Sequence, residues 1–593
     1  MEIKLEDKYK LSKGTRFLTG AQALVRVPIV QARRDKQKNL NTACYISGYR
    51  GSPLGGYDQQ ILKNKKYLNE NNIFFQPGIN EELAATSLWG TQQVNLRKQD
   101  KYDGVFGIWY GKGPGVDRAG DALKHVNLAG TSKFGGVIAL MGDDHVCESS
   151  TTSHQSEFAM IDAMIPFFNP SGVQEILDYG IIGIELSRKS GCWVGIKCVH
   201  DNVSSGATVD LDENRLNLLD ISNEKYPPDG LNIRLKDTAQ EKEYRLHHHK
   251  IKYVKEFCKL NSLNKLIFDS ENPKVGIIST GKSFLDTKLG LEKIGINEDV
   301  ANQVGIKFLK IAMPWPLEET IIEKFSENLE KIIVVEEKRS IIETQVKEIL
   351  FNKNLNVKVL GKNDENNNDL FVSSGALDPG EIGLKISEII NYLNLPDEVN
   401  NLSKKIKSLK EETNSNISLK RVPHFCSGCP HNTSTRIPEG SRAITGISCA
   451  YLVEHMERDN EGFSQMGSEG ATWVGESVFS NTDHVFQNMG DGTYIHSGIL
   501  SIRHAVAAKT KMTFKILYND AVALTGGQAL DGLPTVAQMS KQLEAEGVDE
   551  IAIITDEIEK YGDRGGFARN SKVYDRKNII DVQIELSKIN GTT

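Results

Sequence analysis

Short apolar runs alternate with longer amphipathic stretches along most of the chain. The runs TACYISG, GVFGIWYG, GGVIALMG and CWVGIKCV in residues 1–220 are strand-sized, and each leads into a turn rich in glycine or aspartate. Buried strands that alternate with helices are typical of α/β proteins with parallel sheets. We therefore predict a doubly wound parallel-sheet domain over residues 1–220.

The same alternation recurs in two further blocks. Residues 273–362 contain KVGIISTG, IKFLKIAMPWP and EKIIVVEEK, and residues 421–593 contain RAITGIS, HVFQNMGDG, FKILYND and EIAIITD. The charged residues 221–272 predict a solvated helical linker, and the polar residues 363–420 predict a second linker. The pattern thus predicts an α/β fold with two larger domains and a smaller α/β domain between them.

Composition excludes several classes of protein. The 593 residues are 39% hydrophobic and 25% charged, with a net charge of −7 and mixed signs throughout, so there is no basic footprint for nucleic acid. No apolar run approaches the ~20 residues of a membrane helix, and the charged amino-terminal residues lack the apolar stretch of a signal peptide. Eight scattered cysteines do not make a disulfide scaffold, which favours a cytoplasmic protein.

Three of the cysteines lie in one part of the sequence. Cys426 and Cys429 form a CxxC in FCSGCPH, and Cys449 follows in GISCAY. In a reducing compartment a CxxC indicates a metal or redox site, and metal sites of this kind take four ligands. The three thiols are compatible with an iron–sulfur cluster, a zinc ion or no common site. The other cysteines with apolar or helical surroundings are predicted to be buried small hydrophobes: Cys44, Cys192, Cys198 and Cys258.

The motif Gly490-Asp491-Gly492 ends an apolar strand and precedes a helix, and Asn519 follows the next strand. Free backbone N–H groups and the helix dipole favour phosphate at such a helix start, and glycine lets the backbone approach closely. A diphosphate also needs a hard cation. Asp491, the Asn519 side chain and a backbone carbonyl near Ala521 would supply the oxygen ligands that Mg²⁺ prefers. The alternative is an ordinary turn with no ligand.

These motifs together resemble the indolepyruvate ferredoxin oxidoreductases, which are thiamine diphosphate-dependent 2-oxoacid:ferredoxin oxidoreductases. The likeness rests on GDG with the downstream Asn, on ALTGGQ, on FCSGCPH with TGISCAY, and on MGDDHVCESSTTSHQSE. GYRGSPLGG is similar to the family's substrate loop, with Arg50 and Ser52 in place of its Pro and Thr. The resemblance covers nearly the whole chain and is strongest to the amino-terminal portion of the long fused bacterial form.

The resemblance implies roles for the three blocks. Residues 1–220 would be the pyrimidine-binding domain, residues 273–362 a small domain similar to the transketolase carboxyl-terminal domain, and residues 421–593 the diphosphate-binding domain. Glu81 would contact the pyrimidine N1′ and promote its imino tautomer, with Glu82 as the neighbouring alternative. Without the resemblance, this acid pair would be read as complementing the dipole at a helix start.

The implied site residues fall into three sets. The catalytic set is Glu81, Ser52 and His431. The cofactor-binding set is Gly490, Asp491, Gly492, Thr493, Asn519, Ala521, Thr525, Gly526, Gly527, Gln528, Ser448 and Cys449. The metal ligands are Asp491, Asn519 and Ala521 for Mg²⁺, and Cys426, Cys429 and Cys449 for a [4Fe–4S] cluster.

For several polar residues near these motifs, the sequence allows two interpretations. Lys112 and Arg118 either balance the substrate carboxylate or are surface charges. His145 and His154 are compatible with a zinc site together with Cys147, although histidines in loops are more often not ligands. His496, on the helix after GDG, is a further active-site candidate with an acid–base or a hydrogen-bonding role.

The resemblance implies oxidative decarboxylation of an aryl or branched 2-oxoacid to an acyl-coenzyme A, with electrons passed through the cluster to ferredoxin. No cysteine follows Cys449. We therefore expect a partial or split chain whose fourth ligand comes from beyond Thr593 or from a second chain, and a homodimer or a complex with that chain. The alternatives are a non-oxidative thiamine-dependent decarboxylase and a thiamine-binding assembly subunit that is inactive alone.

Overall fold

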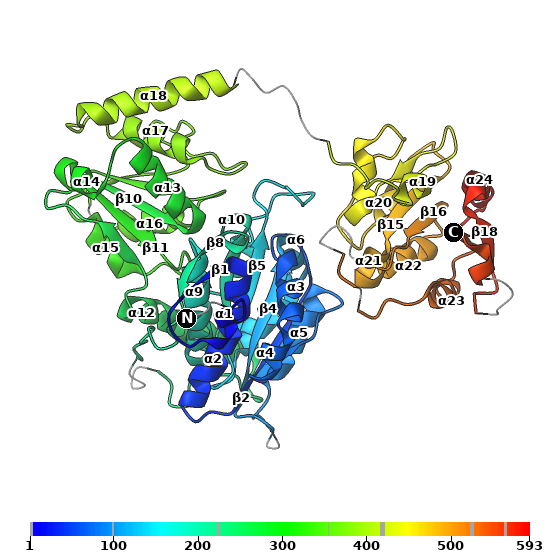
Figure 1. Ribbon diagram of the computed structural model, residues 1–593, viewed down its shortest axis with the longest axis horizontal. Helices are drawn as coiled ribbons and strands as arrows, with labels where there is room; N and C mark the ends of the chain where they lie inside the picture. Colours follow the sequence, from blue (N-terminus) through cyan, green and yellow to red (C-terminus); the bar gives the residue numbers. More distant parts are fainter. Residues whose placement is uncertain are drawn as a thin grey trace. The chain divides into compact units, whose positions relative to one another are not determined.

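The computed structural model divides the chain into two compact units, Met1–Ile417 and Ser418–Thr593 (Figure 1). The first unit contains one parallel sheet, one mostly parallel sheet and an antiparallel two-stranded ribbon, and the second unit contains its own sheets and cores. The structure describes residues 4–97, 100–221, 226–353, 355–414, 422–521, 527–529, 531–561 and 566–593.

The first domain is built on a six-stranded, all-parallel sheet in the order β3-β2-β4-β5-β7-β6. Its strands are β2 (Thr42–Gly48), β3 (Ile73–Phe75), β4 (Gly104–Lys112), β5 (Val137–Asp143), β6 (Phe167–Phe168) and β7 (Val194–Val199). The four strands predicted for this block are confirmed as the central four. They read as continuous apolar runs because helices cover both faces of a parallel sheet.

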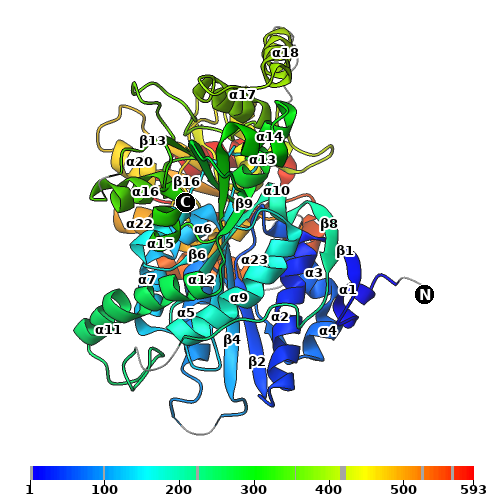
Figure 2. The ribbon, with the colours of Figure 1, turned by 90° about the vertical axis from the view of Figure 1, so that its left-hand side faces the viewer.

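Helices cover both faces of this sheet (Figure 2). On one face α2 (Gly20–Gln37) packs against α9 (Val173–Ser190), and on the other α5 (Glu81–Gln92) packs against α7 (Gly120–Ala129). Arg188 donates two hydrogen bonds of 2.7 Å to Asp35, so a buried bidentate ion pair joins α9 to α2. The remaining helices are α1 (Asp7–Lys10), α3 (Gly55–Lys63), α4 (Lys65–Asn69), α6 (Gly113–Arg118), α8 (Glu157–Asp162) and α10 (His200–Val203).

An antiparallel ribbon at the edge of this domain was not predicted. β1 (Thr15–Thr19) pairs with β8 (Gly206–Asp210), so the two ends of the block lie side by side. The pairing joins segments nearly two hundred residues apart, and neither strand is apolar enough to stand out in the sequence. Long-range pairings of this kind are set by tertiary context rather than by local pattern.

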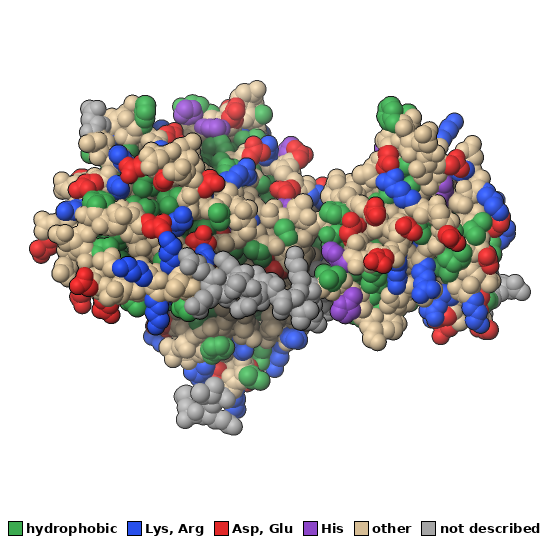
Figure 3. All heavy atoms as spheres, turned by 90° about the horizontal axis from the view of Figure 1, so that it is seen from above, with side chains coloured by type: hydrophobic (Ala, Val, Ile, Leu, Met, Phe, Trp, Pro, Cys, Tyr) green, Lys and Arg blue, Asp and Glu red, His purple; other side chains and the backbone are tan. Residues whose placement is uncertain are grey.

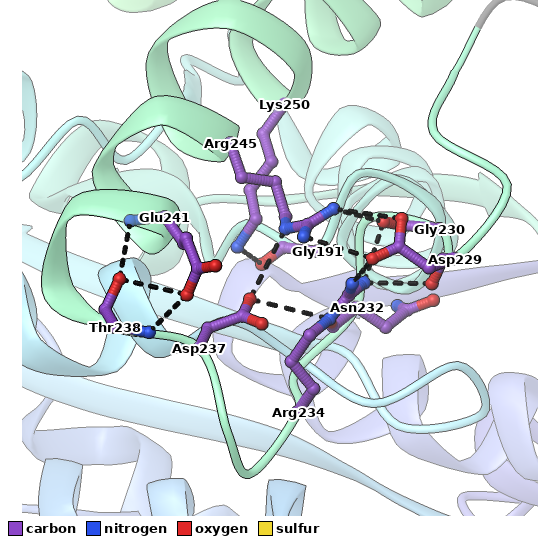
Figure 4. Close-up of polar contacts among 10 residues, drawn as sticks. All are labelled: Gly191, Asp229, Gly230, Asn232, Arg234, Asp237, Thr238, Glu241, Arg245 and Lys250. Atoms are coloured by element: carbon purple, nitrogen blue, oxygen red, sulfur yellow. Dashed lines mark hydrogen bonds and ion pairs between the residues drawn. The ribbon is translucent and has the colours of Figure 1, made fainter.

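The prediction of a solvated linker over residues 221–272 is wrong, because one face of its helices is buried. The segment forms α11 (Ala239–Arg245), the π-helical turn η2 (Leu246–Lys250) and α12 (Ile251–Leu260). Leu246, Val254 and Phe257 are buried in the core of the first domain. Figure 4 shows the polar side of the same region, where Arg234 and Arg245 both contact Asp229 and Asp237. The apolar residues recur at helical spacing and pack on the core, whereas Glu241, Glu243 and Lys252 are exposed.

The smaller domain has a five-stranded sheet in the order β13-β12-β10-β11-β9, in which only β9 is antiparallel. Its strands are β9 (Lys265–Phe268), β10 (Val275–Thr280), β11 (Ile306–Ile311), β12 (Lys331–Val335) and β13 (Lys358–Leu360). Its helices are α13 (Gly281–Lys293), α14 (Glu298–Val304), α15 (Glu319–Ser326), α16 (Ile342–Phe351), α17 (Pro379–Ile389) and α18 (Asp397–Asn414). The domain therefore begins earlier than the predicted residue 273.

The predicted polar linker over residues 363–420 is also corrected. Phe371, Ile382, Ile386 and Val399 are buried in the core of the smaller domain, where α17 packs against α13. The polar residues that suggested a linker surround an amphipathic helix, whose apolar stripe is what packs. The smaller domain joins the first through backbone contacts, including Phe167 N to Trp315 O at 3.1 Å and Asn169 N to Ala312 O at 3.0 Å.

The second unit contains a three-stranded parallel sheet in the order β14-β15-β16 and a two-stranded parallel sheet of β17 and β18. The strands are β14 (Ala443–Ile444), β15 (Val485–Gly490), β16 (Met512–Leu517), β17 (Ile551–Thr555) and β18 (Ser571–Asp575). The helices are α19 (His431–Ser434), η3 (Ser448–His455), α20 (Ala471–Glu476), α21 (Asp491–Thr493), η4 (Tyr494–Gly498), α22 (Ile499–Ala507), α23 (Val536–Glu546), η6 (Ile558–Tyr561), η7 (Arg576–Asn578) and α24 (Ile579–Ser587). The four strands predicted here are confirmed, and with them the α/β fold class.

The surface carries both signs of charge. On the face seen in Figure 3, lysine and arginine side chains are interspersed with aspartate and glutamate on both units. In the part of the chain that the structure describes, no helix is long and apolar enough to cross a membrane.

Candidate functional site

Asp491 joins the GDG motif to the segment that begins at Asn519. It lies at the carboxyl end of the central strand β15, and Asn519 follows the adjacent strand β16. The Asp491 Oδ2 accepts hydrogen bonds from the backbone N–H groups of Asn519 at 2.8 Å and Asp520 at 2.7 Å, and its Oδ1 accepts one from Gly492 at 2.8 Å. Burial raises the pKa of Asp491, and the three backbone N–H groups oppose that shift. Ligands of open α/β folds bind at this edge of a sheet.

His431 lies beside Asn519, with its Nε2 at 3.3 Å from the Asn519 Nδ2. Burial lowers the pKa of His431, so the ring is neutral at pH 7. The His431 Nδ1 and the Thr493 Oγ1 are buried and have no hydrogen-bond partner among the described residues. Buried polar atoms are rarely left without a partner, so this pair fits a polar ligand at the start of the helix.

The oxygen donors here fit a magnesium diphosphate. The Asp491 carboxylate and the Asn519 side chain are hard oxygen ligands, and the Asn519 Oδ1 accepts from the Ala521 N–H at 3.1 Å. Gly527 has a left-handed backbone, and Gln528 is buried. The predicted Thr525 and Gly526 lie outside the described residues.

The three cysteines share one neighbourhood without forming a finished metal centre. Cys426 is exposed, and Cys429 and Cys449 are half-buried. Burial and then the thiols of Cys429 and Cys426 raise the pKa of Cys449, so the CxxC and the later segment face one another. Among the described residues, however, no three His, Cys, Asp or Glu side chains are grouped closely enough to hold a metal ion. The donors suit an iron–sulfur cluster in kind, but their spacing does not preform one.

Glu81 is the buried member of the predicted acid pair, whereas Glu82 is half-buried. Glu81 is the first residue of α5, which the Asn80 side chain caps by accepting the Leu83 N–H at 3.0 Å. The Trp109 Nε1 donates to the Glu81 carbonyl at 3.0 Å. A Cβ on Gly115 would lie 2.3 Å from the Glu81 Oε1, so the missing side chain there leaves room for the carboxylate.

The loop with Ser52 lies at the same edge of the first sheet, after β2. The Ser52–Pro53 peptide bond is cis, and a Cβ on Gly51 would lie 3.0 Å from the Lys112 Cβ at the end of β4. Lys112 donates to the Ser149 carbonyl, and burial lowers the pKa of its ammonium group. Glu81 is buried, whereas Lys112 and Arg118 are both half-buried.

The two loop histidines do not assemble with Cys147. The His154 Nε2 lies 3.3 Å from the Asp117 Oδ2, while His145 is buried and Cys147 is exposed. Burial, assisted by nearby lysines, lowers the pKa of His145 to about 2. Over the described parts of the chain these side chains form no metal-binding group, so the zinc interpretation has no support. The prediction that Cys44, Cys192, Cys198 and Cys258 are buried is confirmed.

Two residues close to predicted ones were not predicted from the sequence. Gly115 is close to Glu81 only in the folded chain, and Glu469 is fully buried between the cysteine segment and GDG. For Glu469 the available signal was its place in MGSEGA, where an acid sits among glycines. His496 is buried after GDG, with its Nδ1 at 2.8 Å from the Ser497 Oγ.

Two family models match parts of the chain. Residues 265–416 match the indolepyruvate oxidoreductase domain, and residues 449–558 match the carboxyl-terminal thiamine pyrophosphate-binding domain of thiamine enzymes. Indolepyruvate oxidoreductase subunit IorA of Methanothermobacter marburgensis is 25% identical over 562 residues, which span 93% of this chain and 82% of that protein. Along most of its length the chain is similar to the indolepyruvate ferredoxin oxidoreductase family. The Archaeoglobus fulgidus subunit is 27% identical over 552 residues, or 89% of this chain and 78% of the relative.

Two solved structures also align with this chain. A 2-oxoglutarate:ferredoxin oxidoreductase from Magnetococcus marinus aligns with a TM-score of 0.45 and 14% identity over 64% of this chain and 66% of that one. A split-gene transketolase aligns with a TM-score of 0.37 and 11% identity over 63% of this chain and 98% of that one. The matched thiamine pyrophosphate-binding domain and the IorA relatives confirm the predicted enzyme class, a thiamine diphosphate-dependent oxidoreductase of 2-oxoacids.

Proposed function

We propose that the protein oxidatively decarboxylates an aryl or branched 2-oxoacid to its acyl-coenzyme A. The observation that carries the proposal is the junction of Asp491 with the Asn519 segment, beside the buried, unpartnered His431 Nδ1 and Thr493 Oγ1. This arrangement offers oxygen ligands to a cation and polar groups to a diphosphate at one sheet edge. Asp491, Asn519 and the Ala521 carbonyl would hold Mg²⁺, and residues 490–493 would contact the diphosphate.

The residues of the first domain take the other tasks. Glu81 would hold a proton at the pyrimidine N1′, in a buried position that Gly115 keeps open. Ser52 and Lys112 lie at the adjacent strand ends, where they would orient the carboxylate of the 2-oxoacid. Bound thiamine diphosphate supplies the nucleophilic carbon that makes loss of CO₂ feasible. In the second unit, His431, neutral and buried, would hydrogen-bond beside the candidate diphosphate site.

The cysteines would carry the electrons. Cys426, Cys429 and Cys449 would hold a [4Fe–4S] cluster with a fourth ligand from a partner chain, and ferredoxin would be the acceptor. The support is that, after burial, the Cys429 and Cys426 thiols raise the pKa of Cys449, together with the subunit names of the relatives. A complex with a second chain also explains why the three thiols are near one another without being grouped as a finished centre.

The test is anaerobic purification of the chain alone and with a candidate partner chain, followed by iron and sulfide analysis. Viologen reduction is then assayed with indolepyruvate, coenzyme A, Mg²⁺ and thiamine diphosphate. We expect reduction that depends on all four additions and on bound iron, and its loss in Cys429→Ser. Iron-free protein that releases aldehyde and CO₂ would instead establish a non-oxidative decarboxylase. Protein that binds thiamine diphosphate but neither reduces viologen nor releases CO₂, even with its partner, would establish an assembly subunit.

A further inference from the structure

A fully buried carboxylate, Glu469, lies between the cysteine segment and the GDG motif. Its side chain has no solvent exposure, and burial raises its pKa to about 7. Its Oε2 accepts the Gly467 N–H at 2.7 Å, and its Oε1 accepts the Ile447 N–H at 3.4 Å. A buried ionisable group is costly unless hydrogen bonds satisfy it. The carboxylate therefore joins its own turn at Gly467 to the earlier segment at Ile447.

The segment at Ile447 begins the turn that carries Cys449. Ile447 caps η3, and the next residue, Ser448, has a left-handed backbone with φ of 70°. A left-handed serine is strained and persists only where its surroundings fix it. A Cβ on Gly446 would lie 2.4 Å from the Asn488 carbonyl, so this turn is pressed against β15. The contact at Ile447 thus fixes the turn directly before its strained residue.

The same carboxylate is electrostatically coupled to the segment after GDG. His496 lies in η4, behind Asp491, and is close enough to Glu469 to oppose the effect of burial on the pKa of that carboxyl group. His496 is itself buried. Glu469 therefore connects the Gly467 turn and the Cys449 turn, and faces the start of the helix that follows the candidate diphosphate site.

We propose that Glu469 is a positioning residue that fixes the Ile447–Cys449 turn and thereby places the Cys449 thiol between the CxxC and the diphosphate-binding segment. The backbone hydrogen bonds at Ile447 and Gly467 supply the placement. That the Cys449 thiol ligates an electron carrier rests on the proposed function. The placement of the thiol by Glu469 does not.

The first test is thiol alkylation of the full-length protein without cofactors, read at each cysteine by mass spectrometry. Exposed Cys426 is the internal reference, and Glu457→Gln, at an exposed site of the same unit, is the matched control. In Glu469→Gln the amide cannot accept both N–H groups. We expect the Cys449 rate to rise roughly tenfold while the Cys426 rate is unchanged, because a buried hydrogen bond to a charged acceptor is lost. An unchanged Cys449 rate would overturn the proposal.

A second measurement covers the case in which the variant fails to fold. Hydrogen exchange of the wild-type chain should show slow exchange of the Ile447 and Gly467 N–H groups, and rapid exchange at both would overturn the proposal. After reconstitution with iron and sulfide, the reduced cluster of Glu469→Gln should also show an altered electron paramagnetic resonance spectrum. Failure of the wild type to take up iron would count against the proposed function alone, because alkylation and exchange need no cluster.

Discussion

At the scale of single residues, the position of Glu81 in the first unit depends on a residue that has no side chain. Gly115 sits in α6, and an added Cβ would lie 2.3 Å from the Glu81 Oε1. A contact that short cannot persist, so either the carboxylate or the helix must move. Acid–base groups act only within hydrogen-bond reach of their target, which makes the Glu81 position sensitive to this one glycine.

Gly115→Ala should therefore lower the rate of 2-oxoacid oxidation by roughly 10²-fold, close to the loss in Glu81→Gln, because both remove a placed acid–base group. Gly120→Ala is the matched control, since a Cβ there meets no atom within 4 Å. The measurements are steady-state rates and thermal unfolding of all three variants. Wild-type activity in folded Gly115→Ala would show that Glu81 is not held by this contact.

Residue identity was more predictable than residue contact. Asp491 and Asn519 were predictable because each follows a strand in a recognisable sequence motif. In the structure the Asn519 N–H donates a hydrogen bond to the Asp491 carboxylate. Glu469 and Gly115 carried no comparable signal, because burial and close approach arise between elements that are distant in sequence. The same reason hid the packing of residues 370–399, whose apolar stripe is diluted by polar neighbours.

At the scale of elements, the π-helical turn η2 places a lysine inside the first domain. Lys250 is buried, and its Nζ donates to the Gly191 carbonyl at 3.2 Å (Figure 4). Burial lowers its pKa from 10.5 to about 8. The folded-state pKa lies below that of the unfolded chain, so the lysine is charged in the fold below about pH 8 and costs about 3 kcal/mol there.

Lys250→Met should therefore raise the free energy of unfolding at pH 7 by about 1–3 kcal/mol, after allowance for the lost hydrogen bond. The stability advantage of Lys250→Met should shrink as pH rises from about 8 to 10.5. Over this range the wild-type lysine loses its proton first in the folded state and then in the unfolded state. Denaturant unfolding at several pH values checks this, with exposed Lys252→Met as the control. A stability difference that does not change with pH would contradict the buried-charge account.

At the scale of the whole molecule, the chain is two units with separate cores. The cores of Met1–Ile417 and those of Ser418–Thr593 share no residue. The predicted Glu81 and Asp491 thus belong to different units. Alternating strands and helices were enough to predict this series of α/β domains, because buried parallel strands leave a continuous apolar signal. The β1–β8 ribbon and the true extent of the smaller domain needed tertiary contacts.

Because each unit buries its own core, residues 1–414 and 422–593 should each fold when expressed alone. Thermal unfolding followed by circular dichroism should give a cooperative transition for each fragment. The full-length chain should show transitions near those of the fragments. A fragment 422–593 with secondary structure but no cooperative transition would show that its core depends on the first unit.

The central claim is that Asp491 and its neighbours bind thiamine diphosphate with Mg²⁺. Calorimetric titration of the full-length chain with both ligands tests this most directly, with exposed Asp483→Asn, directly ahead of β15, as the control. The account predicts saturable, Mg²⁺-dependent binding to the wild type and the control, and no measurable binding to Asp491→Ala. Equal affinity of wild type and Asp491→Ala, or no binding to the wild type, would contradict it.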